Sequence, residues 1–61
     1  METVKIDATM LGMDATEDHA RQMVNLLRAE GYDARYVGGN QGDARAVPDD
    51  VWERLLAKIG Q

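Results

Sequence analysis

The chain has 61 residues and a formal net charge of −4, from eleven acidic and seven basic side chains. It contains no cysteine and no serine, which excludes disulfides, thiolate metal sites, and serine or cysteine nucleophiles. The deficit of lysine and arginine argues against binding nucleic acid through its phosphates.

The first segment, TVKIDATM at residues 3–10, alternates between apolar and polar side chains. One side carries Val4, Ile6, Ala8 and Met10, and the other carries Thr3, Lys5, Asp7 and Thr9. A period of two with β-branched residues predicts a half-buried strand. Because its second side is polar, we expect helices on one face of the sheet only.

The second segment predicts a helix over residues 15–30. Apolar residues recur at helical spacing at Ala20, Met23, Val24 and Leu27. Asp14 and Glu17 stand three apart, as in a capping box that has Asp in place of Ser or Thr. Gly31 is expected to end the helix, with Tyr32 contacting Leu27 in a Schellman motif.

A short alternating segment at residues 33–38 predicts a second strand, which would complete a βαβ unit with parallel strands and a right-handed crossover. Ala34 and Tyr36 would face the helix. Arg35 would lie on the open face beside Lys5 and Asp7, where an exposed Asp7–Arg35 pair would contribute a few tenths of a kcal/mol.

The glycine-rich stretch YVGGNQGDARAV, residues 36–47, raises the question of a phosphate-binding loop. Such a loop needs a helix that starts at its glycines, but here ARAV and Pro48 follow, and the Gly-Lys-Ser/Thr ending is absent. The stretch therefore predicts a turn. ARYV and ARAV can then pair as an antiparallel hairpin, or the segment is a loop without a third strand, because alanine has modest strand propensity.

The last segment predicts a helix over residues 48–59, ended by Gly60. Pro48 suits the first helical position, and Asp49 and Asp50 complement the positive helix start. One apolar stripe runs along this helix: Val51, Trp52, Leu55, Leu56 and Ile59.

Together these segments predict an α+β fold of one domain, residues 1–61. It is a small two-layer βαββα arrangement, with two helices packed on one face of a two- or three-stranded mixed sheet. No segment approaches the ~20 apolar residues of a membrane span, and no signal peptide is evident. We therefore expect a cytoplasmic, soluble protein.

Eight residues are candidates for partner binding: Met10, Leu11, Met13, Trp52, Asp49, Asp50, Arg35 and Arg45. Met10, Leu11 and Met13 either fill the core and pack the loop, or protrude together as a small apolar contact. The second alternative is considered because methionine is common at adaptable binding surfaces. Trp52 is either core or an interface anchor. The aspartates either start a helix or form an acidic surface that occupies a basic site on a partner. The two arginines would form a nucleic-acid contact with the tyrosines.

The sequence offers few residues that could form a metal-binding or catalytic site. The single histidine, His19, stands beside Glu17 and Asp18, which point in different directions on a helix, so a surface histidine is expected and not a metal ligand. No catalytic or cofactor site is predicted.

We therefore expect a non-enzymatic protein-interaction module, an inhibitor or regulator of a larger protein. From the small size, the acidic composition and the lack of cysteine, we also expect a phage or mobile-element protein. The alternatives are a self-associating unit that dimerises through an unpaired sheet edge and, less favoured, a module that binds single-stranded nucleic acid.

Overall fold

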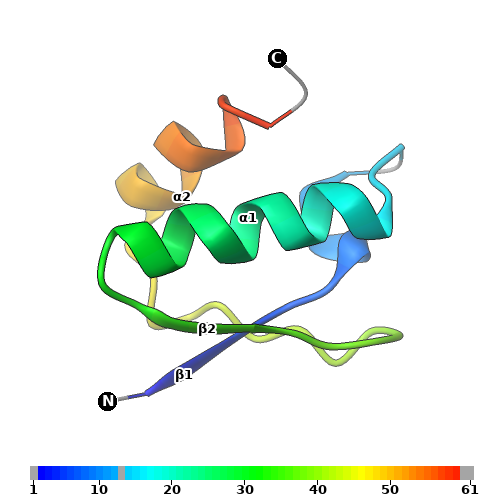
Figure 1. Cartoon of the computed structure of the whole chain (residues 1–61), viewed down its shortest axis with the longest axis horizontal. Helices are drawn as coiled ribbons and strands as arrows, with labels where there is room; N and C mark the ends of the chain where they lie inside the picture. The colour runs from blue at the N-terminus through cyan, green and yellow to red at the C-terminus, as the bar shows by residue number, and fades with distance from the viewer. Residues whose placement is uncertain (1, 13, 60–61) are drawn as a thin grey trace.

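The structure, a computed structural model, describes residues 2–12 and 14–59. Its elements in chain order are β1 (Thr3–Ile6), a 3-10 helix η1 (Ala8–Leu11), α1 (Glu17–Ala29), β2 (Asp33–Tyr36) and α2 (Asp49–Leu56) (Figure 1). The predicted contact residue Met13 and the predicted helix end Gly60 lie outside the described residues.

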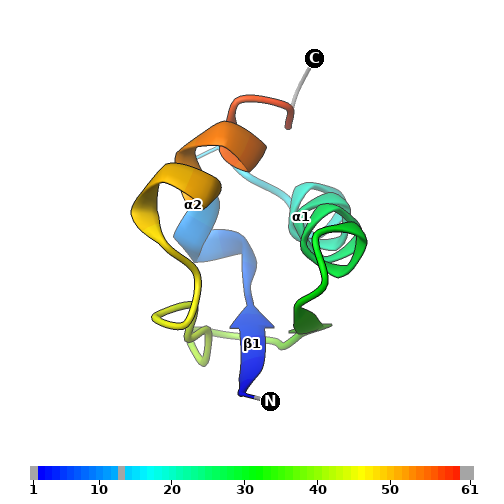
Figure 2. The same cartoon turned by 90° about the vertical axis from the view of Figure 1, so that its left-hand side faces the viewer.

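The two strands are parallel, as the βαβ pattern predicted, and Val4 lies opposite Ala34 in their register. The side chains of Val4, Ile6 and Ala34 are fully buried, whereas Lys5 and Arg35 are exposed. Both helices lie on the same side of the strands (Figure 2). Alternation along each strand therefore separates a covered face from an open one, as expected.

The first strand is shorter than predicted, because it ends at Ile6 and the chain turns into η1. The side chain of Asp7 causes this turn: it is only 2% exposed, and it accepts hydrogen bonds from the Thr9 hydroxyl and from the backbone N–H of Gly42, the latter at 2.6 Å. The prediction that Asp7 pairs with Arg35 on the open face is therefore wrong. Arg35 instead pairs with Asp33, with 3.9 Å between Arg35 Nε and Asp33 Oδ1.

Helix α1 starts two residues later than predicted, with Thr16 as its N-cap. The Thr16 hydroxyl accepts from the His19 N–H at 3.4 Å, and the Thr16 N–H donates to His19 Nδ1 at 3.0 Å. The capping box therefore consists of Thr16 and His19, and the pairing of Asp14 with Glu17 is not used. The extended backbone of Thr16, with φ −113° and ψ 175°, provides the geometry that a cap requires.

The end of α1 matches the predicted Schellman motif. The N–H of Tyr32 donates to the carbonyl of Leu27 at 3.0 Å, and the N–H of Gly31 donates to that of Arg28 at 3.0 Å. Gly31 has a φ of +101°, a conformation in which a side chain would be strained. Glycine at this position therefore directs the chain from α1 into β2.

The predicted hairpin and third strand are absent from the described residues. β2 ends at Tyr36, and the returning chain crosses to the other side of β1, where Asp43 alone pairs with Lys5 through two antiparallel hydrogen bonds of 2.9 and 2.8 Å. Residues 44–47 then form a turn, closed by a 3.0 Å hydrogen bond from Val47 N–H to the Ala44 carbonyl. The sheet therefore has two parallel strands and is not mixed, and the order is β-α-β-α with η1, in place of βαββα.

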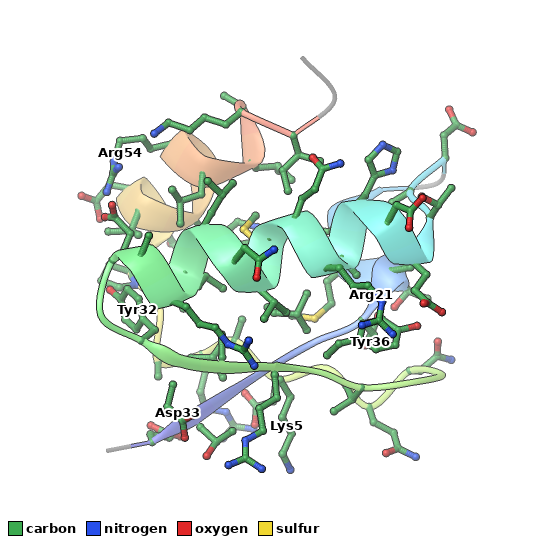
Figure 3. The ribbon with its side chains drawn as sticks, in the orientation of Figure 1. Lys5, Arg21, Tyr32, Asp33, Tyr36 and Arg54 are labelled. Carbon is green, nitrogen blue, oxygen red and sulfur yellow. The ribbon has the colours of Figure 1, made fainter. Side chains whose placement is uncertain are left out.

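Helix α2 begins at Asp49, one residue later than predicted, so Pro48 is the N-cap and not the first helical residue. The helix ends at Leu56, and turns continue through Ile59. From the last turn of α2, the Arg54 guanidinium donates to the Glu30 carboxylate at the end of α1, and this contact lowers the pKa of Glu30. This contact thus joins α2 to the end of α1, where Figure 3 labels Arg54.

The core lies between the strands and the two helices. Its buried apolar residues are Val4, Ile6, Ala20, Met23, Val24, Leu27, Ala34, Val47 and Leu55. Of the apolar stripe on α2, only Leu55 is fully buried, and the other four residues are half-buried. Among the described residues, no helix has both the length and the apolar character needed to cross a bilayer.

Replacing Leu55 by alanine is expected to remove about 2–5 kcal/mol of stability, since a buried leucine leaves a cavity, and this loss approaches the whole free energy of unfolding of a small domain. Leu56→Ala, at a half-buried position of the same helix, is the matched control and should cost less. Chemical denaturation followed by circular dichroism gives both values. Equal losses would show that α2 does not pack through Leu55.

Replacing Gly42 by alanine is expected to destabilise the fold by about 1–3 kcal/mol, because the new Cβ would clash with Met10 Sδ and Asp7 Oδ2. Gly38→Ala is the control, since a Cβ there meets no atom within 4 Å, and it should leave stability unchanged or raise it slightly by restricting the unfolded chain. Thermal unfolding compares the two. A Gly42→Ala protein as stable as Gly38→Ala would contradict the close approach of Gly42 to Asp7.

Candidate functional site

Met10 and Leu11, predicted as part of one apolar contact, take different positions. The Met10 sulfur accepts from the backbone N–H of Asp7 at 3.4 Å and lies against Gly42. This environment favours the packing role for Met10. Leu11 is half-buried and lines a surface groove.

This surface, the apolar groove, forms where η1 and the start of α1 meet the end of α2. Its lining residues are Leu11, Gly12, Asp14, Ala15, His19, Leu56 and Ile59. Sequence patterning singled out Leu11 but assigned Leu56 and Ile59 to the core stripe. Their half-exposure has a simple cause: a helix of eight residues can turn only one narrow side to the core, and Leu55 occupies it.

Carboxylates lie at one end of the apolar groove. Asp14 borders it. Glu17 and Asp18 follow in the first turn of α1, but they are not among its lining residues, and Glu17 pairs with Arg21 at 2.9 Å. The capping box of Thr16 and His19 fixes this turn, so the position of the carboxylates is defined by the helix start. The groove therefore combines an apolar floor with one carboxylate, that of Asp14, at its border.

The remaining acidic candidates do not belong to this groove. Asp49 and Asp50 are exposed in the first turn of α2, at the end of that helix opposite to Leu56. They complement the positive end of the helix, which is the role that their position favours. Trp52 is half-buried and packs against the core, so it still has an accessible part.

A second surface, the basic groove, runs between α1 and the outer edge of β2. Arg21, Asn25 and Arg28 border it from the helix, and Asp33, Arg35 and Tyr36 border it from the strand. The Arg21 guanidinium lies over the Tyr36 ring, 4.9 Å from its centroid, and Figure 3 shows these two side chains meeting between α1 and β2. Of these arginines, the sequence singled out only Arg35.

Arg35 and Arg45 are not brought together as a hairpin pair. Arg45 is 80% exposed and pairs with Asp43 at 3.1 Å; hydrogen bonds from Arg45 to Asp43 lower the pKa of that carboxyl group. Tyr36 lies toward the helix, under Arg21, whereas Lys5 points away from the helices (Figure 3). The arginine–tyrosine platform expected for nucleic-acid binding is therefore not formed by these residues.

The chemistry that these surfaces offer is apolar contact and charge pairing. Within residues 2–12 and 14–59, no three histidine, aspartate or glutamate side chains come together in a way that could hold a metal ion. Comparisons of the chain with protein-family models, with curated proteins and with solved structures find no match.

Proposed function

We propose that this chain is a non-enzymatic protein-interaction module that inhibits or regulates a larger protein. The observation that supports the proposal is the apolar groove, where Leu11, Leu56 and Ile59 stay half-buried. Contiguous apolar surface rimmed by polar residues is typical of protein-binding sites. Covering Leu11, Leu56 and Ile59 with a partner would bury further apolar surface, which favours association.

The carboxylate at the border of the groove indicates the chemistry of the partner. A protein that docks here would present apolar side chains flanked by lysine or arginine, which would face Asp14. Such complementarity speeds association and selects the orientation of the complex more than it adds affinity. We therefore expect binding to weaken, but to persist, at raised salt concentration.

Inhibition by a chain of this kind needs no chemistry of its own. A 6.8 kDa protein that covers a functional surface of a larger one blocks access to that surface. The acidic composition and the lack of cysteine agree with a small cytoplasmic regulator of phage or mobile-element type, which competes for a basic site.

Affinity capture from a lysate of the native host, with three immobilised proteins, tests this proposal. Leu56→Glu places a charge in the apolar groove and should reduce the captured partner about tenfold or more, because a buried unpaired charge disrupts an interface core. Gln41→Glu adds the same charge at an exposed loop position and should bind like the wild type. Circular dichroism establishes that all three are folded.

Two results would contradict the proposal. One is a wild-type protein that retains no partner at any salt concentration. The other is equal capture by the wild type and Leu56→Glu, which would show that the apolar groove is not the binding surface.

A further inference from the structure

The basic groove lies along a strand edge that the rest of the domain leaves open. Within residues 2–12 and 14–59 the sheet consists of β1 and β2, so β2 has a neighbouring strand on one side and not on the other. The Val37 N–H donates to the Ile6 carbonyl at 2.8 Å. Because backbone groups alternate between the two sides of a strand, those of Ala34 and Tyr36 point outward, to the basic groove.

One of these outward-pointing backbone groups, the Ala34 carbonyl, accepts a hydrogen bond from a side chain. Arg28 Nε donates to the Ala34 carbonyl at 2.9 Å, so a guanidinium takes the position that the N–H of a neighbouring strand would occupy. Arg28 is exposed and can leave this acceptor at small cost. The edge is thus protected in the free protein without being permanently closed.

The charge of the side chains that line this edge is opposite in sign to that of the whole chain. Arg21, Arg28 and Arg35 border the groove, and Asp33 is the carboxylate among its lining residues. Glu17, one helical turn before Arg21, pairs with Arg21 Nε at 2.9 Å, so an incoming carboxylate would share or replace that contact. These arginines are three of the seven basic residues in a chain of net charge −4. Such a concentration of guanidinium groups complements carboxylates, with which arginine forms strong paired hydrogen bonds.

We propose that an extended acidic segment of a partner protein adds to the outer edge of β2 as a third strand. Its backbone pairs with Ala34 and Tyr36, as in other cases of strand addition. Its carboxylates meet Arg21 and Arg28 on the helix side and Arg35 on the other side. On binding, the Arg28 guanidinium leaves the Ala34 carbonyl and donates to a carboxylate of the partner. A backbone N–H of the incoming strand then donates to the Ala34 carbonyl in its place.

Two other occupants fit less well. A nucleotide base would need a free aromatic face, but Arg21 lies over the Tyr36 ring. A second copy of this chain, paired edge to edge, would place two basic grooves side by side, and like charges that face one another across strands are destabilising. The acidic strand is the occupant that both the edge and the charge favour.

This inference does not depend on the apolar groove, and either proposal can fail alone. The probe is a fluorescein-labelled octapeptide in which pairs of glutamates alternate with single threonines, so that both of its faces carry carboxylates. A glutamine version is its neutral control. Fluorescence anisotropy with the full-length chain should show binding of the acidic peptide, weakened by salt, and much weaker binding of the neutral one.

Matched variants locate the site. Arg21→Gln and Arg35→Gln should each weaken binding about threefold, the size expected for exposed charge pairs. Arg45→Gln removes the same charge from the 80% exposed Arg45, outside the groove, and should leave binding unchanged. In nitrogen-15 spectra, the Ala34 and Tyr36 amides and the Arg28 Nε–H should shift on binding.

Backbone pairing has its own test. One version of the acidic peptide is N-methylated at every amide, so it keeps its carboxylates but has no N–H to donate to the Ala34 carbonyl. Strand addition predicts that this version binds much more weakly than the unmethylated peptide, because an added strand is held by its backbone hydrogen bonds.

Three outcomes would overturn the proposal. They are equal binding by the methylated and the unmethylated acidic peptide, equal losses for Arg45→Gln and Arg35→Gln, and no binding of the acidic peptide at low salt. Sedimentation equilibrium adds a fourth: a dimer whose Ala34 and Tyr36 amides are protected without peptide would make a second copy the occupant.

Discussion

The buried carboxylate of Asp7 holds together two parts of the chain that are far apart in sequence. It accepts from the hydroxyl of Thr9, two residues away, and from the N–H of Gly42 at 2.6 Å, thirty-five residues away. Hydrogen bonds from Thr9, first of all, and from Gly42 hold its pKa below the ordinary value, against the opposing effect of burial. A charged group at a nearly dry position is stable only with such donors.

The consequences of this contact extend across the fold. At Asp7, β1 stops and η1 begins, which places Leu11 beside Leu56 and Ile59 in the apolar groove. The hydrogen bond from the Gly42 N–H to Asp7 also brings the next residue, Asp43, to the outer side of β1. The returning chain is therefore not available to pair with β2, and the outer edge of β2 stays open beside its arginines. One buried carboxylate thus contributes to the formation of both candidate surfaces.

The sequence predicted those parts of the fold that depend on local patterns. The helical spacing of Met23, Val24 and Leu27 predicted α1, and Gly31 with Tyr32 predicted how that helix ends. The parallel pairing of the strands followed from the length of the crossover. The absence of a helix directly after Gly42 likewise followed from ARAV and Pro48, so the glycine-rich stretch forms a turn, and the next helix begins only at Asp49.

What could not be predicted depends on contacts between distant residues. Asp7 sits at a polar position of an alternating pattern, and nothing near it in sequence shows that the Gly42 amide will meet it. The same holds for the basic groove: Arg21 and Arg28 read as the solvent face of a helix, and only the docking of α1 along β2 places them beside Arg35. The expected third strand does not form beside β2. The hydrogen bond from the Gly42 N–H to Asp7 leads the returning chain to the other side of β1 before ARAV begins.

A pH titration followed by nuclear magnetic resonance tests the central contact most directly. It records the side-chain carboxyl carbon of Asp7 and the amide proton of Gly42 in the same sample. The account predicts one shared titration curve with a midpoint below 3.8, the ordinary value for an aspartate, because the folded state favours the charged carboxylate. A midpoint at or above 3.8 for Asp7, with a Gly42 amide that does not respond, would contradict it.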